Sequence, residues 1–264
     1  MYSVFQLAKK YFKYYTTASN GRGHGVHSPF VYEFITNVLQ DKSSNPVFNK
    51  IEDRRKDLLS DKSVIQIEDF GAGSAVLPFK SRVVGQTAKV SLKSKKYSQL
   101  LFKIVKYFQA KTVVELGTSF GITTSYLASA TYGKVYTFEG ASSIANIARQ
   151  TFSHLNLTQI DIIQGDFAKT LTNKLQAIGQ VDIAFLDGNH RKNPTIEYFN
   201  LFKDHINENS ILIFDDIHWS KGMEEAWEEI KNDSQVTLTI DLFFIGLVFF
   251  RKNFKEKQHF TIRF

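Results

Sequence analysis

The sequence predicts an α/β fold with a mostly parallel sheet of seven strands, the last two of which form an antiparallel pair. Three observations predict this class. Short apolar segments alternate with helical patterns from residue 98 onward, and a glycine-rich loop follows the first of these segments. The last two apolar segments are too close together for a helix to connect them, so they should pair antiparallel. Residues 1–97 lack the alternation, and we expect a helical and irregular N-terminal extension there, followed by a domain over 98–264.

Composition is that of an ordinary globular protein. The chain has 264 residues, of which 43% are hydrophobic and 22% are charged, so it can bury a large core. No apolar run approaches the roughly 20 residues that cross a bilayer, and the N-terminus has no uninterrupted signal-peptide core. A cytoplasmic location without a membrane partner is therefore expected. Because the sequence has no cysteine, thiolate metal sites and cysteine nucleophiles are excluded.

The elements of the N-terminal extension follow from local patterns. Residues 2–15 have an amphipathic helical pattern, and Pro29 can open a second helix to about Leu39 with Ser28 as its cap. A third, shorter helix is expected over 51–59. The stretch 64–90 is expected to be irregular.

The domain that follows has a regular order of elements. Such apolar strands, connected by helices, indicate a parallel sheet covered on both faces. Strands are expected over 111–116, 134–139, 160–164, 181–187 and 210–215, helices over 121–130, 142–154, 194–206 and 221–231 with a short one after Asp166, and the closing strand pair over 236–241 and 244–251.

The loop after the first strand indicates what kind of ligand the sheet binds. Its sequence, ELGTSFG, places Glu115 directly before a bend whose glycines are Gly117 and Gly121. Dinucleotide sites use a G-x-G-x-x-G spacing that directs backbone amides at a pyrophosphate. A carboxylate at the start of the loop would repel phosphates, but it suits a ligand with an ammonium group and a sulfonium. The spacing therefore disfavours a nicotinamide-dependent oxidoreductase.

A second acid ends the next strand. Glu139 lies about twenty residues after the loop, where Rossmann-like folds place an acid that accepts hydrogen bonds from ribose hydroxyls. After the third strand, Gly165 and Asp166 could reach an adenine edge. Each feature alone is weak, but the loop, the acid and the strand order together favour a nucleoside ligand.

These segments carry a resemblance to a known family. ELGTSFG, TFEG, QGDF and FLDGNH, in that order, resemble the successive motifs of class I S-adenosylmethionine-dependent methyltransferases with a Rossmann-like sheet, over roughly residues 98–251. Within that class the chain looks most like the metal-dependent O-methyltransferases of the catechol and caffeoyl-CoA type. The resemblance implies S-adenosylmethionine as cofactor and assigns to it the residues Glu115, Gly117, Thr118, Ser119, Gly121, Thr123, Glu139, Gly140, Asp166, Phe167 and Asp187.

Acidic residues follow the fourth and fifth strands. Asp187 ends one strand, and Asp215 and Asp216 end its neighbour. Carboxylates gathered at one sheet edge suit a hard cation such as Mg²⁺, and the resemblance implies a metal held by these three residues. Consecutive strand residues point to opposite faces, so Asp215 and Asp216 can share a metal only if the strand has ended. In the alternative interpretation, one of them caps the next helix.

His190 departs from the family pattern. In the catechol-type enzymes a lysine three residues after the first metal aspartate acts as general base, and here that position is His190. A histidine titrates near neutrality and could take the acceptor proton, so we assign Asp187 and His190 as candidate catalytic residues. His190 could equally be an ordinary loop residue. His218 is a weaker candidate for base or ligand.

Two other patterns are given structural roles. Glu68–Ser74 looks like a second acid–glycine loop, but Pro78 interrupts any following helix, and we interpret residues 69–76 as a turn or lid. His24 and His27 lie on a glycine loop without further ligands nearby, which favours structural or substrate-facing roles over a metal site.

The leading hypothesis is an O-methyltransferase for a small hydroxylated acceptor, in which residues 1–97 supply a lid and an acceptor pocket. An RNA ribose methyltransferase is a second hypothesis because the net charge is +7. A non-catalytic cofactor-binding module is a third. Nucleic acid is the less favoured partner, a homodimer is possible, and the sequence does not identify the acceptor.

Overall fold

The computed structural model describes residues 1–23, 25–67 and 80–264 of the chain. It divides into two compact units. The terminal unit comprises Met1–Asp41 and Ile178–Phe264, and the central unit comprises Lys42–Ala177. This division does not coincide with the expected boundary near residue 98, because the first forty residues fold with the C-terminal part of the chain.

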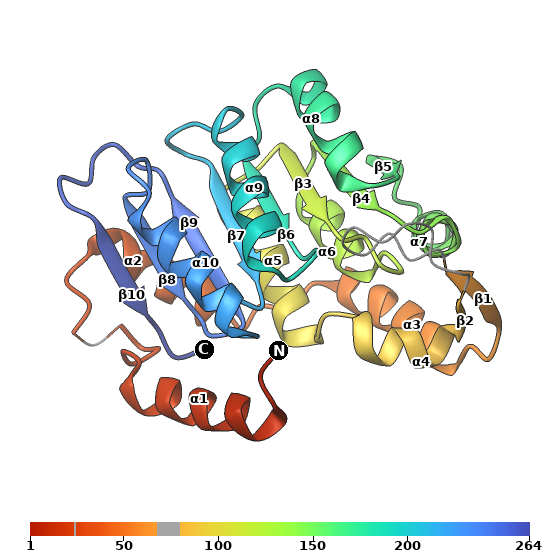
Figure 1. The fold of residues 1–264 in the computed structure, drawn as a ribbon, viewed down its shortest axis with the longest axis horizontal. Helices are drawn as coiled ribbons and strands as arrows, with labels where there is room; N and C mark the ends of the chain where they lie inside the picture. The colour runs from red at the N-terminus through yellow and green to blue at the C-terminus, as the bar shows by residue number, and fades with distance from the viewer. Residues whose placement is uncertain (24, 68–79) are drawn as a thin grey trace. The chain divides into compact units, whose positions relative to one another are not determined.

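The sheet of the central unit consists of three parallel strands, β3 (Thr112–Leu116), β4 (Lys134–Glu139) and β5 (Ile160–Gln164). They lie side by side in sequence order, as Figure 1 shows. The connecting helices are α6 (Ile122–Ala130) and α7 (Ser142–His154), and α8 (Phe167–Ile178) follows β5. These bounds agree closely with the predicted elements, except that α8, which was expected to be short, has 12 residues.

The terminal unit contains the strands that were expected later in the chain. β6 (Ile183–Leu186) and β7 (Ile211–Asp215) pair parallel, and β9 (Ile245–Phe249) pairs antiparallel with both β7 and β8 (Leu238–Asp241). The helices α9 (Lys192–Lys203) and α10 (Lys221–Asn232) pack beside each other (Figure 1). The predicted class, a mostly parallel α/β sheet with an antiparallel C-terminal pair, is confirmed.

An additional edge strand extends the terminal unit beyond the seven strands expected. β10 (Gln258–Thr261) pairs parallel with β8, and its polar sequence gave no strand signal. Within this unit the strand order is β10-β8-β9-β7-β6.

The N-terminal helices begin where capping residues place them. α1 (Val4–Thr17) has a capping box between Ser3 and Gln6. α3 (Pro46–Ser60) begins earlier than predicted because the Asn45 side chain accepts a hydrogen bond from the Val47 amide, with Pro46 at the first turn. α2 (Pro29–Phe34) continues into a π-helix, η1 (Ile35–Leu39). Ser28 precedes α2 as predicted, but its side chain makes no capping hydrogen bond.

The expectation of an irregular stretch over 64–90 is wrong for its described residues, 64–67 and 80–90. β1 (Val64–Ile67) and β2 (Lys80–Val83) form an antiparallel pair, with Val64 opposite Val83, and α4 (Val84–Ser91) follows directly. Then α5 (Lys95–Tyr107), which was not predicted, leads into β3. Four-residue strands paired across a long intervening segment leave little local pattern, which explains the omission.

Among the described residues, no helix combines the length and the apolar character that a membrane span requires.

Candidate functional site

The glycine loop connects β3 to α6 in the central unit through left-handed backbone. Gly117 has a φ of 98° and Gly121 a φ of 82°, values at which a side chain is strained. The amides of Gly117 and Thr118 both donate to the carbonyl of Phe138 on β4, at 3.0 and 3.1 Å. The loop is therefore bent back over the end of the neighbouring strand, as a nucleoside site at the carboxyl ends of parallel strands requires.

Glu115 lies beneath this loop and is completely buried. One of its carboxylate oxygens accepts hydrogen bonds from the hydroxyls of Thr124 on α6, at 2.5 Å, and Thr137 on β4, at 2.6 Å. The Thr137 hydroxyl also lies 2.6 Å from that of Thr118. Glu115 thus connects β3, β4 and α6. Its contact with the cofactor, which the resemblance implies, stays a prediction. Thr123, another predicted contact, is also buried at the start of α6.

Glu139 ends β4 and is held by backbone donors. Its two carboxylate oxygens accept hydrogen bonds from the amides of Ser119, at 2.9 Å, and Ala141, at 3.0 Å. Burial raises the pKa of this carboxyl, although the amides of Ala141, Ser119 and Gly140 act in the opposite direction. The acid that the sequence placed on the ribose therefore lies directly against the glycine loop.

The next strand end is connected to Glu139 through its backbone. The Gly165 amide donates to the Glu139 carbonyl at 2.9 Å. The Asp166 side chain accepts from the Ala168 amide at 3.0 Å, so it caps the start of α8, and Phe167 contacts Phe138 edge-on. The residues assigned to ribose and adenine thus lie at adjoining strand ends of one unit.

One contact of the loop was not predicted. The Ser91 hydroxyl, at the end of α4, lies 2.9 Å from the Ser119 hydroxyl of the glycine loop. No sequence signal identified it, because α4 itself was not expected. The contact brings the segment before β3 to the candidate cofactor loop.

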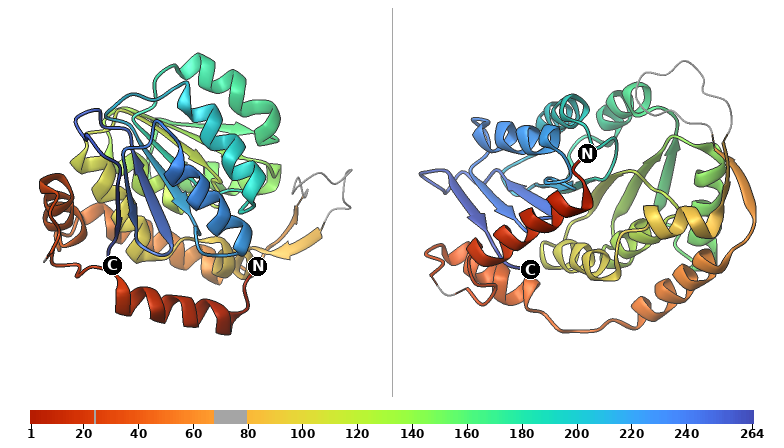
Figure 2. Two further views of the ribbon diagram at one scale, coloured as in Figure 1. Left: turned by 60° about the vertical axis from the view of Figure 1, so that its left-hand side comes forward. Right: turned by 60° about the horizontal axis from the view of Figure 1, so that its bottom comes forward.

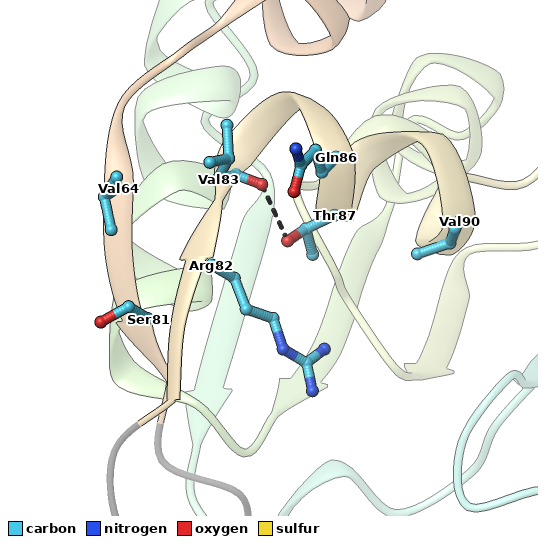
Figure 3. A pocket seen from close by; sticks show the side chains of 7 residues that line it. All are labelled: Val64, Ser81, Arg82, Val83, Gln86, Thr87 and Val90. Carbon is cyan, nitrogen blue, oxygen red and sulfur yellow. Dashed lines mark hydrogen bonds between the residues drawn. The ribbon is translucent and has the colours of Figure 1, made fainter.

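A pocket of about 320 Å³ lies on the same segment. Figure 3 shows that α4 and the β1–β2 pair line it, with the Arg82 side chain extending alongside Thr87. Its lining is mixed, with three valines beside polar side chains. The lining residues are Val64, Ser81, Arg82, Val83, Gln86, Thr87 and Val90.

The acidic cluster belongs to the terminal unit. Asp187 follows β6, Asp215 ends the neighbouring strand β7, and His190 follows Asp187 by three residues. Each offers one ligand atom, and these atoms all lie within 4.8 Å of one another. The His190 Nε2 is 3.4 Å from an Asp187 oxygen, and Asp215 is buried. Two carboxylates and an imidazole at this spacing are a donor set that fits a divalent cation.

Asp216 does not belong to this cluster in the described part of the chain. It lies just beyond β7 with a left-handed φ of 52°, and its amide donates to the Phe244 carbonyl at 2.7 Å. The strand has ended before Asp216, which is the condition for Asp215 and Asp216 to share a metal. The third residue of the cluster is nevertheless His190. The alternative that Asp215 or Asp216 caps the next helix is wrong, because Ser220 caps α10.

His218 has other partners. Its ring nitrogens lie 3.1 Å from a Glu224 oxygen and 2.8 Å from an Asp241 oxygen. Burial alone would lower the pKa of this imidazole, but the two carboxylates outweigh it and raise the pKa. A histidine held between two acids is poorly suited to accept a substrate proton.

The second acid–glycine loop over 68–74, with the lid expected over 69–76, lies outside the described residues, and so does His24. His27 is described, and it does not belong to the cluster of possible ligands found in that part of the chain.

Part of the chain is similar to a known family of domains. Residues 114–217 match a family model described as a methyltransferase domain. An uncharacterised protein of Acanthamoeba polyphaga mimivirus is 36% identical over 58 residues, which are 21% of this chain. The match spans 26% of that protein's length.

Solved structures resemble the chain over most of its length. A methyltransferase from Podospora anserina, bound to S-adenosylhomocysteine, covers 96% of this chain and 98% of its own with a TM-score of 0.60 and 10% identity. The Bacillus cereus O-methyltransferase in complex with S-adenosylhomocysteine covers 83% of this chain and 97% of its own with a TM-score of 0.54 and 18% identity. At these identities, the likeness establishes the fold.

The chain therefore has the fold of these solved methyltransferases, and its residues 114–217 resemble a methyltransferase domain, in agreement with the motifs. The matched segment includes the glycine loop, Glu139, Asp166, the 187–190 loop and β7.

Proposed function

We propose that this chain transfers the methyl group of S-adenosylmethionine to a hydroxyl oxygen of a small molecule, with the assistance of a divalent cation. The observation that carries the metal-assisted form is the convergence of Asp187, His190 and Asp215 within 4.8 Å. The O-methyltransferases of similar fold support oxygen as the accepting atom.

The cofactor would be held by the central unit. The bend of Gly117 to Gly121 provides room for the amino-acid part, and the carboxylate of Glu139 would accept hydrogen bonds from the ribose hydroxyls. Asp166 and Phe167 would lie along the adenine. When bound, the cofactor supplies an electrophilic methyl on a sulfonium.

In the reaction, an acceptor oxygen forms a bond to the methyl carbon while the carbon–sulfur bond breaks and the sulfonium becomes a neutral thioether. His190 would take the proton of the acceptor hydroxyl. Asp187 and Asp215 would hold the cation, which when bound lowers the pKa of a hydroxyl and orients it. The remaining work of the chain is positioning and exclusion of water.

The acceptor surface is assigned to the segment before β3. The pocket beside α4 and the hydrogen bond between Ser91 and Ser119 support this role, which agrees with the expected contribution of residues 1–97. Its mixed valine and polar lining favours a small molecule with both apolar and hydrogen-bonding parts.

The test is methyl transfer from labelled cofactor to a panel of hydroxylated acceptors, combined with Mn²⁺ binding by calorimetry. We expect Asp187→Ala to lower transfer by roughly a hundredfold or more and to weaken Mn²⁺ binding, since a cation held by the remaining ligands is poorly fixed. Asp204→Ala changes an exposed carboxylate of the same unit and should leave both unchanged.

His190→Ala separates base from ligand in the same experiment. We expect lower turnover with little change in affinity for S-adenosylhomocysteine or Mn²⁺, because Asp187 and Asp215 hold the cation. Clearly weaker Mn²⁺ binding would assign the imidazole to the cation and contradict its role as base. Full activity in excess chelator would remove the metal from the mechanism. Binding of S-adenosylhomocysteine without turnover on any acceptor would contradict catalysis itself.

A further inference from the structure

Helix α1 exposes a stripe of large apolar side chains. The exposed fractions are 88% for Val4, 80% for Phe5 and 70% for Phe12. Tyr15, on the same helix, and Met1, just before it, are exposed as well. Positions 5, 12 and 15 recur at spacings of seven and three, which places them on one side of a helix. Half of the large hydrophobic residues exposed in the described chain belong to this one segment.

The opposite side of α1 fixes this orientation. Tyr14 and Ala18 are buried with Phe243, in the turn between β8 and β9, and the Tyr11 ring meets that of Phe243 edge-on at 5.0 Å. The Lys10 ammonium pairs with Glu224 of α10 at 2.9 Å. Figure 2 shows α1 lying along the edge of the terminal unit. The exposed stripe is therefore the outer side of a docked helix and not a fraying end.

The charge of this segment is entirely basic. Lys9 and Lys13 are exposed beside the stripe, and no aspartate or glutamate precedes Glu33. A second copy of the chain would bring its own lysines against these, without a carboxylate on either α1 to pair with them. A partner that carries negative charge next to an apolar region fits both the lysines and the apolar stripe.

We propose that α1 docks this protein on a membrane surface that contains anionic lipids. A basic amphipathic helix with phenylalanines on its apolar side lies in the plane of the interface, with its rings among the acyl chains and its lysines at the headgroups. This peripheral mode needs no spanning helix, and it replaces the expectation that the chain has no membrane partner. It is independent of the proposed methyl transfer.

The test is cosedimentation of the full chain with vesicles of phosphatidylcholine alone or mixed with phosphatidylglycerol. We expect binding to the mixed vesicles that weakens with added salt, because salt screens the lysines. Lys9→Gln with Lys13→Gln should lower the partition coefficient roughly 30-fold, at about 1 kcal/mol for each lysine near the surface. Phe5→Ser with Phe12→Ser should lower it by roughly tenfold or more.

Matched controls place the same changes elsewhere. Tyr132 is fully exposed on the central unit, and Lys42 and Lys62 are exposed lysines of that unit. Tyr132→Ser and the double change Lys42→Gln with Lys62→Gln should bind vesicles as the unchanged chain does. Circular dichroism should find all variants folded, since every altered side chain is exposed.

The proposal is overturned if the unchanged chain does not bind the mixed vesicles, or if the α1 variants bind as well as the controls. It is also overturned if sedimentation finds a dimer that Phe5→Ser with Phe12→Ser dissociates, because the stripe would then be an interface between copies of this chain.

Discussion

The buried carboxyl of Glu139 makes cofactor affinity depend on pH. Its ionised form is the acceptor for ribose hydroxyls, and burial raises its pKa above the ordinary 4.5. Affinity for S-adenosylhomocysteine should therefore fall as the pH drops through this raised pKa, at a higher pH than an exposed glutamate would give. Glu139→Gln should lower affinity about tenfold and remove this pH dependence, as measured by calorimetry from neutral to acid pH. An acid limb that persists in Glu139→Gln would assign the titration to another group.

The same shift has the opposite sign for the folding of the unbound protein. Burial favours the protonated carboxyl in the folded chain. Its contribution to stability is therefore fully present below the unfolded pKa and is lost as the pH rises through the folded pKa. In urea unfolding without ligand, the free energy of unfolding should fall with rising pH over this range. Glu139→Gln should remove this fall.

The location of a residue could be predicted where it follows from the order of the strands alone. Glu139 could be assigned because an acid at the end of the second strand must lie beside the loop after the first. Asp187 and Asp215 could be assigned for the same reason, since parallel neighbours end at one edge. The third member of that cluster could not be, because whether His190 or Asp216 completes it depends on the left-handed turn after β7. Nor could the two threonine partners of Glu115, which come from other elements.

Among the elements, the start of α6 depends on one glycine. The backbone at Gly121 has a φ of 82°, and a Cβ added there would lie 2.5 Å from the Phe152 ring of α7. Gly179 has a φ of 77° but nothing within 4 Å, so it is a control for backbone strain alone. We expect Gly121→Ala to lower the free energy of unfolding by about 3 kcal/mol and Gly179→Ala by about 1 kcal/mol, as measured with urea. Equal losses would mean that α6 and α7 can separate without cost.

Elements were predicted well where strands are apolar and helices have caps. From β3 to β9, strands and helices follow the expected order with small shifts at their ends. The β1–β2 pair, α4 and β10 were missed for a common reason. Each is short, so its local pattern is weak, and each is stabilised by another segment: β1 and β2 pair with each other, β10 pairs with β8, and α4 packs against α3.

At the scale of the whole molecule, the two ends of the chain fold together. The Ser19 amide donates to the carbonyl of Thr261, the last residue of β10, and the Ser19 carbonyl accepts from the Arg263 amide just beyond it. The Tyr14 hydroxyl donates to the Ile262 carbonyl and accepts from the Phe264 amide. These contacts join residues more than 240 positions apart, and no local pattern indicates them, so residues 1–97 were expected to form one extension.

This joining of the ends predicts that the N-terminal segment stabilises the terminal unit. Tyr14 is buried against Phe243, so Tyr14→Ala should lower the free energy of unfolding by about 3 kcal/mol. Phe12→Ala, which changes an exposed ring on the same helix, should have almost no effect. Hydrogen exchange should find faster opening of β10 and β8 in Tyr14→Ala, while β3, β4 and β5 stay protected. If Tyr14→Ala and Phe12→Ala unfold at the same Tm, α1 contributes nothing to the fold and the terminal unit begins at β6.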